Sequence, residues 1–362
     1  MKLIGSIAAA SLLIAPVLSV QPYLFAFGDS LSDNGNTAIQ DNNIPYWNNR
    51  MSNGPVWNEY TAYFNRLKLV NYAHEGSVTD NDLIASATGI KVGVPSLKDQ
   101  ISRFSATFKN ITTPELLAKS IASITIGSND LEAISTLGSS KIFQGVAAAD
   151  AAIKSMVRSI DALHSLGFRN VIFSNFPQPG DIPAISIGSN TTAIAASIAS
   201  SLSSTSLIAK VNALNVGYKD KFKKLTVIDL HKTIAVFKDS GVVSATDIQN
   251  TKNGCYNVDK NKNLVSKCDN PENYFFFDSA HPTAIVHAVV GAIVSESLMS
   301  SNGYDVSPDI VKNLVSKYGI ERVYSKPGSS INQKLISALT AIEYNMAEAE
   351  SNYQKIIQDI TS

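Results

Sequence analysis

The sequence predicts an α/β fold, built around a mainly parallel sheet with helices on both faces. Short apolar runs alternate with segments of helical spacing along most of the chain, which is typical of such sheets. The run at 24–27 leads directly into Gly28-Asp29-Ser30, and the run at 120–126 leads into a polar segment that contains Asn129. Ligands bind beyond the carboxyl ends of parallel strands, so we expect a site built from these loops.

The elements are expected in a regular order along the chain. Strands are predicted at 24–27, 70–73, 120–126, 170–174 and 225–230. Helices are predicted at 57–69, from Ser139 or Ser140 to His164, and at 186–206, 210–222, 231–237 and 284–299. Residues 38–56 and 238–277 are expected to be mostly loop.

Composition and charge exclude several functions. The 362 residues carry 30 Lys plus Arg and 30 Asp plus Glu, so the chain has no basic surface for nucleic acid.

Lys2 precedes an apolar run at 12–18 that is too short to span a bilayer, and small residues suit cleavage after Ser19. We expect a signal peptide at 1–19, a catalytic domain at 20–302, a helical extension at 303–362 and no transmembrane segment. The expected location is extracellular.

Export agrees with the cysteines and with two acceptor tripeptides for glycosylation. Cys255 and Cys268 lie in a loop rich in Gly, Asn and Lys, where a disulfide is favoured over two reduced thiols. Closing so short a loop contributes about 3 kcal/mol in the chain-entropy model, and it holds the segment leading to Asp278. Asn110 and Asn190 each begin an Asn-x-Thr tripeptide.

The segment after residue 300 has a different pattern. Apolar residues recur every three or four positions from Ile331 to Ile360 on a segment otherwise rich in polar residues, which predicts one amphipathic helix. Its apolar stripe could pack on its own domain, on a partner helix or on a lipid surface.

Three residues could form a nucleophilic site. Ser30 stands at a strand end, where it is either a nucleophile or a helix cap. Asp278 lies three residues before His281 and could orient the imidazole through Nδ1, leaving Nε2 as a base. The alternative for this Asp-x-x-His pair is an ordinary surface feature.

Attack on an ester also requires donors for the oxyanion that forms. The backbone N–H groups of Ser30 and Gly76 and the neutral side-chain amide of Asn129 could supply them. Seen separately, these positions also fit a turn glycine and an Asx turn. All three follow predicted strands, which favours one common site.

Four ordered runs resemble the GDSL or SGNH hydrolase family: FAFGDSLSDNGNT, NYAHEGSVTDN, ITIGSND and DSAHPT. The similarity spans residue 24 to about 300, and SNGPVWNEY at 52–60 also resembles secreted fungal, plant and some bacterial members. The resemblance implies a flavodoxin-like α/β/α sandwich, with Ser30 as nucleophile, His281 as base and Asp278 as its orienting carboxylate. It also implies Ser30, Gly76 and Asn129 as the oxyanion hole.

The resemblance implies a secreted ester hydrolase that needs no metal or organic cofactor. We expect an acetylesterase acting on short acyl esters of carbohydrates, with Tyr46, Trp47 and Trp57 near the site or in the core. A lipase acting on longer acyl esters and a catalytically lapsed binding protein are the alternatives. Glu75 departs from the family, which usually has a small residue before the glycine, and it could disfavour anionic substrates.

Overall fold

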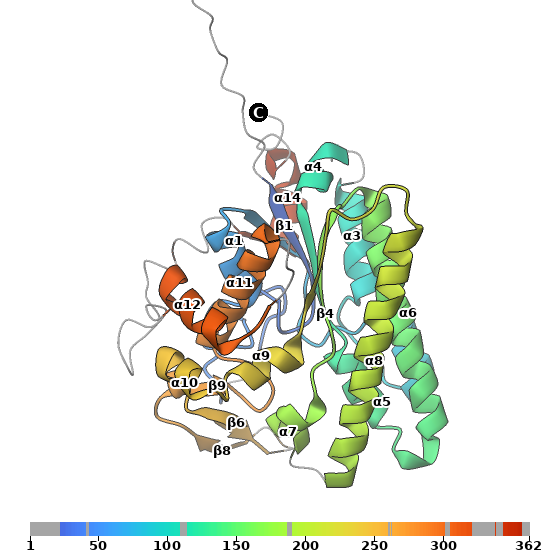
Figure 1. The fold of residues 1–362 in the computed structure, drawn as a ribbon. Helices are drawn as coiled ribbons and strands as arrows, with labels where there is room; N and C mark the ends of the chain where they lie inside the picture. The colour runs from blue at the N-terminus through green and yellow to red at the C-terminus, as the bar shows by residue number, and fades with distance from the viewer. Residues whose placement is uncertain are drawn as a thin grey trace, which may run out of the picture.

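The centre of the molecule is a sheet of six parallel strands, in the order β10-β2-β1-β3-β4-β5 (Figure 1). The computed structural model describes residues 22–40, 43–108, 114–186, 190–259, 261, 263–300, 305–320, 337 and 343–356. The strands of this sheet are β1 (Tyr23–Gly28), β2 (Lys68–Asn71), β3 (Ile121–Thr125), β4 (Asn170–Ser174), β5 (Lys224–Ile228) and β10 (Glu343–Asn345). The predicted parallel sheet is confirmed.

Both faces of the sheet are buried, as the continuous apolar strands require. Along β1, Leu24 and Ala26 belong to one core cluster, while Tyr23, Phe25 and Phe27 belong to the other. Alternate residues of a strand point to opposite faces, so β1 contributes to both hydrophobic cores at once. The outcome is the expected α/β/α sandwich.

The helices form two layers, one against each face of the sheet (Figure 1). On one side α1 packs on α11, which also contacts α12, and on the other side α6 packs on α3 and α8. The described helices are α1 (Trp57–Phe64), α2 (Asn81–Thr88), α3 (Leu97–Phe108), α4 (Pro114–Lys119), α5 (Ser128–Ser135), α6 (Ile142–Leu166), α7 (Pro183–Ser186), α8 (Asn190–Gly217), α9 (Leu230–Val236), α10 (Ser240–Thr246), α11 (Ala284–Met299), α12 (Pro308–Tyr318) and α14 (Met346–Ser351).

Several predicted boundaries agree with the structure, and others shift. Strand β4 and helix α11 have the predicted limits, and α6 ends before Gly167, which adopts φ 117°. The helix expected to reach residue 69 stops at Phe64, because β2 begins at Lys68. The helix expected to reach residue 222 stops at Gly217. Helices α2 and α3 were not predicted.

The segment at 238–277, expected to be mostly loop, contains helix α10 and two small sheets. Strand β6 (Asn250–Gly254) pairs with β9 (Tyr274–Phe276), and β7 (Tyr256–Val258) pairs with β8 (Leu264–Lys267). The predicted disulfide between Cys255 and Cys268 is present and joins these two small sheets. The N–H groups of Cys255 and Tyr256 donate to Phe276 O and Phe277 O, so the cross-linked segment also holds the chain that leads to Asp278.

The prediction of a single helix for the tail is wrong over residues 343–356. Glu343–Asn345 forms β10, which pairs with β2, and α14 follows at once. Met346, Ala349 and Ile356 are buried in the same core as β1, so these members of the apolar stripe pack on their own domain. They are not available to a partner helix or a lipid surface.

A buried ion network holds β10 in place. Arg50 Nη2 lies 2.7 Å from Glu59 Oε1 and 2.9 Å from Glu343 Oε1. The N–H of Met346 donates to Asn36 Oδ1 at 2.7 Å, which ties the chain after β10 to the loop after β1. The last strand of the sheet is thus connected to the loop that carries Ser30.

Some predictions concern residues outside the described ranges. The signal peptide at 1–19 and Asn110 lie there, and Asn190 is the first residue of α8. Over the described ranges, no helix combines the length and apolarity needed to cross a bilayer.

Candidate active site

The structure brings Ser30, His281 and Asp278 together in one hydrogen-bonded chain. Ser30 Oγ lies 2.9 Å from His281 Nε2, and His281 Nδ1 lies 2.7 Å from Asp278 Oδ2. Ser30 is two residues beyond β1, and the Asp278–His281 loop leads into α11. A hydroxyl, an imidazole and a carboxylate in this order can deprotonate the hydroxyl as it attacks an electrophile.

Asp278 is held in position by several donors. Its Oδ1 accepts the backbone N–H groups of Ala280 and His281, both at 2.7 Å. Its Oδ2 accepts the hydroxyl of Tyr46 at 2.6 Å as well as the imidazole. Burial alone would raise the pKa of Asp278, but the charge of the neighbouring His281 and these hydrogen bonds favour the ionised carboxylate and lower the pKa below its ordinary value.

The charges around His281 make its imidazole a stronger base. Burial alone would lower the pKa of His281, but the negative charges of Asp278, Asp29 and Glu75 outweigh it and raise the pKa above its ordinary value of 6.5. Burial raises the pKa of Asp29 itself to about 7. Glu75, the departure noted in the sequence, therefore contributes negative charge at the imidazole.

The family resemblance seen in the sequence implies ester hydrolysis, and the pH profile of that reaction should show the titration of His281. Only the neutral imidazole can accept the proton of Ser30, so kcat/KM should fall about tenfold per pH unit below the pKa, with a midpoint above 6.5. Rates on p-nitrophenyl acetate against pH measure this. Asp278→Asn removes the charge that raises the pKa, so the acid limb should move to lower pH. A profile that stays flat down to about pH 5 would contradict a histidine base.

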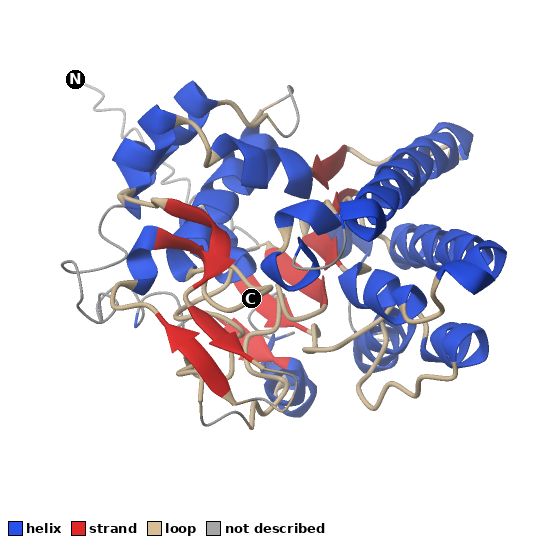
Figure 2. Cartoon of the chain, turned by 90° about the horizontal axis from the view of Figure 1, so that it is seen from below, coloured by secondary structure: helices blue, strands red, loops and turns tan. Residues whose placement is uncertain are grey.

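Three neighbouring strand ends surround Ser30, because β1 lies between β2 and β3. The N–H of His74 after β2 donates to Gly28 O at 3.1 Å, and the N–H of Asp29 donates to Thr125 O of β3 at 3.1 Å. Gly28 is required here, since a Cβ at this position would overlap the Thr125 carbonyl oxygen. Figure 2 looks onto this end of the molecule.

The expected oxyanion donors lie on these same loops. In the part of the chain that the structure describes, neither the Ser30 N–H nor the Gly76 N–H donates to another residue. Asn129 donates one amide hydrogen to Ser77 O at 2.8 Å, which leaves its second hydrogen for a ligand. The three groups could bind a negatively charged oxygen between them.

Comparison with known proteins identifies the family of this chain. Residues 24–294 match the family model described as GDSL-like lipase/acylhydrolase. The chain belongs to this family. GDSL esterase/lipase 7 of Arabidopsis thaliana is 28% identical over 316 residues, covering 74% of this chain and 86% of that protein. Another GDSL esterase/lipase of the same plant is 25% identical over 303 residues, covering 71% and 82%.

A solved structure of a family two carbohydrate esterase from Clostridium thermocellum is 12% identical, with a TM-score of 0.38, and the match covers 79% of this chain and 65% of that one. The membership of the GDSL family makes this protein a carboxylic ester hydrolase.

Two side chains support the site of this GDSL hydrolase and were not predicted. Asp33 accepts the N–H of Glu75 at 2.8 Å and so positions the turn that contains Gly76. Gln100 of α3 bonds both the N–H and the carbonyl of Gly28, at 2.8 and 2.9 Å, and donates to Ser77 Oγ. Asp33 stands in the first family run, whereas nothing local in the sequence marks Gln100.

The three aromatic residues expected near the hydrolase site have structural contacts. Tyr46 bonds Asp278, as described. Trp57 is only 2% exposed and donates from Nε1 to Ser32 Oγ at 3.1 Å, so its core alternative is confirmed. Trp47 packs against the guanidinium of Arg50, with 4.9 Å from Cζ to the ring centre.

Proposed function

We propose that this protein is a secreted serine esterase in which Ser30, His281 and Asp278 form the catalytic triad, and that it removes acetyl or similarly short acyl groups from carbohydrates. The observation that carries the proposal is the chain of hydrogen bonds from Ser30 Oγ through His281 to Asp278, at 2.9 and 2.7 Å. The disulfide supports secretion, because such bonds persist in oxidising compartments.

In the proposed mechanism, Ser30 Oγ attacks the ester carbonyl while His281 Nε2 takes its proton. The N–H groups of Ser30 and Gly76 and the amide of Asn129 bind the oxyanion. His281 then protonates the leaving alcohol, and an acyl-enzyme remains on Ser30. Water, deprotonated by His281, attacks that acyl group, and the acid leaves as Ser30 regains its proton.

A lipase-like activity is the second candidate, favoured by one surface feature. Ile142, Phe143 and Val146 at the start of α6 are 58%, 89% and 63% exposed, and α6 packs on α5, which follows β3. Such a patch suits contact with a lipid surface. The tail no longer supports this activity, because Met346, Ala349 and Ile356 are buried.

The acyl-length profile separates the two candidates. We expect kcat/KM on p-nitrophenyl acetate to exceed that on the octanoate by at least about tenfold, because a site for short acyl groups gains nothing from added methylenes and excludes them by shape. Acetate release from acetylated xylan should accompany it. Higher rates on long chains and at emulsion interfaces would instead identify a lipase.

A catalytically lapsed binding protein is tested separately by covalent labelling. A fluorophosphonate should react with Ser30 of the native protein and not with the heat-unfolded protein. An unlabelled but folded protein would favour the binding function.

A further inference from the structure

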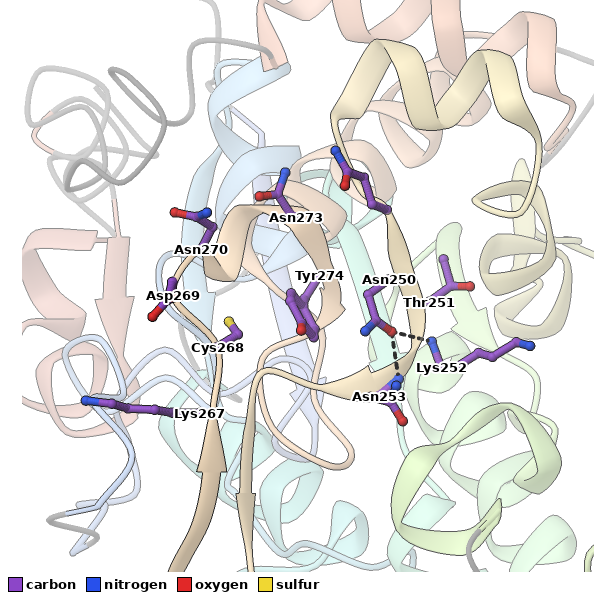
Figure 3. A pocket seen from close by; sticks show the side chains of 11 residues that line it. Asn250, Thr251, Lys252, Asn253, Lys267, Cys268, Asp269, Asn270, Asn273 and Tyr274 are labelled. Carbon is purple, nitrogen blue, oxygen red and sulfur yellow. Dashed lines mark hydrogen bonds between the residues drawn. The ribbon is translucent and has the colours of Figure 1, made fainter.

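A polar groove lies next to the chain that leads to Asp278, between the segment 249–253 and the segment 267–274 (Figure 3). Its volume is about 660 Å³, within the range of pockets that hold small ligands. It is lined by Gln249, Asn250, Thr251, Lys252, Asn253, Lys267, Cys268, Asp269, Asn270, Asn273 and Tyr274. The groove uses none of the residues of the proposed triad or oxyanion hole.

The chemistry of the lining suits a ligand that carries many hydroxyl groups. Five of the eleven residues have carboxamide side chains, and each carboxamide offers both donors and acceptors, as hydroxyl groups do. Tyr274 adds an aromatic ring, which Figure 3 shows near the middle of the groove. The lining also contains Lys252, Lys267 and Asp269, so it carries charges of both signs.

The groove is built on fixed residues. Asn250 Oδ1 accepts the N–H groups of Lys252 and Asn253, both at 3.0 Å, and these bonds are drawn in Figure 3. Asn273 donates from Nδ2 to Asp247 O at 2.8 Å. The disulfide at Cys268 holds the other wall. A preorganised wall lowers the entropy that a ligand loses on binding.

Two carboxamides of the groove are available to a ligand. The side chains of Asn253 and Asn270 are exposed, and neither forms a hydrogen bond with any residue that the structure describes. They lie on opposite walls of the groove: Asn253 is in β6, and Asn270 is in the segment before β9. A ligand in the groove could therefore contact both.

The groove is within reach of Ser30 for an extended ligand. Tyr274 precedes Asp278 by four residues, which span at most about 14 Å even when fully extended. The backbone of Gly254 at the end of β6 also lies against that of Asp278. The approach is so close that a Cβ on Gly254 would overlap the Asp278 carbonyl. Figure 1 shows β6 and β8 in the lower part of the molecule, together with α5, which directly follows the carboxyl end of β3.

We propose that this groove binds sugar residues of the substrate, on the alcohol side of the ester, while the acyl group lies at Ser30. The inference rests on the proposed function, since it names the part of the molecule that recognises the carbohydrate. It assigns Asn253 and Asn270 as specificity-determining residues. A small synthetic ester such as p-nitrophenyl acetate would not reach them.

Kinetics on two substrates test the groove. We expect the double variant Asn253→Ala, Asn270→Ala to raise KM for acetylated xylo-oligosaccharides about tenfold, because hydrogen bonds to the sugar are lost, with kcat little changed. Its kcat/KM on p-nitrophenyl acetate should equal that of the native enzyme. Asn313→Ala, at an exposed position on α12, is the matched control and should change neither substrate.

Direct binding separates failure of the groove from failure of the proposed function. The Ser30→Ala protein, titrated calorimetrically with deacetylated xylo-oligosaccharide, should bind it, and the added groove substitutions should remove the heat of binding. Unchanged KM and unchanged sugar binding in the double variant would contradict the proposal that the groove binds sugar, whatever the rate of ester hydrolysis. If the native protein releases no acetate but still binds the sugar, only the proposed function would be overturned.

Discussion

Ser30→Ala is expected to reduce kcat on p-nitrophenyl acetate by roughly 10⁴- to 10⁶-fold, to the level supported by binding and the oxyanion donors alone. The substitution removes the oxygen that is proposed to form the acyl-enzyme, while His281 and Asp278 should keep their mutual hydrogen bond, which is 2.7 Å in the native protein. Fluorophosphonate labelling should disappear with the activity. Steady-state rates of the purified protein measure the loss.

Ser174→Ala is the matched control for this experiment. Ser174 also ends a parallel strand, is buried, and its hydroxyl has no partner among the described residues. Its removal should leave kcat unchanged and the free energy of unfolding nearly unchanged. Substantial esterase activity in Ser30→Ala would exclude Ser30 as the nucleophile.

Asn129→Ala is expected to lower kcat by about 100- to 1,000-fold with little change in KM. Its amide is proposed to bind the oxyanion, whose charge develops only as Ser30 attacks, so the loss should fall on the transition state. Measuring kcat and KM separately on p-nitrophenyl acetate shows where the effect lies.

Asn129 also holds Ser77 O, so a control must isolate that structural bond. Asn170 donates its side-chain amide to Ala118 O at 3.0 Å, at the opposite end of the sheet. Asn170→Ala should destabilise the protein in thermal unfolding without changing kcat. A similar small effect of both variants on kcat would show that Asn129 has only a structural role.

The parts of the fold that could be predicted are those whose signal is local. The continuous apolar runs of β1, β3 and β4 are buried on both faces, and Gly167 marks the end of α6 in the sequence itself. Asp278 and His281 could be predicted from their Asp-x-x-His spacing. Ser30, Gly76 and Asn129 could be predicted because each follows a strand in one order along the chain. Their juxtaposition follows from the parallel topology, which places the ends of β2, β1 and β3 side by side.

The parts that could not be predicted depend on contacts between distant residues. The hydrogen bonds of Gln100 to Gly28 join positions 72 residues apart, and Tyr46 reaches Asp278 across 232 residues. Glu343–Asn345 lies inside an amphipathic pattern, and its three residues become a strand because β2 offers an open edge and Arg50 offers a charge partner for Glu343. Tertiary pairing here outweighs helical periodicity.

The position of β10 in the sequence also bears on how the nascent chain matures. Glu343 pairs with Leu69, about 270 residues earlier, so β2 remains the edge of the sheet until that length has been synthesised. At 5 to 20 residues per second this takes roughly 15 to 55 s. Throughout that time the unpaired edge of β2 is a template for aggregation. Docking of β10 is therefore a late step that closes this edge, and a ribosome-bound chain should need protection until it occurs.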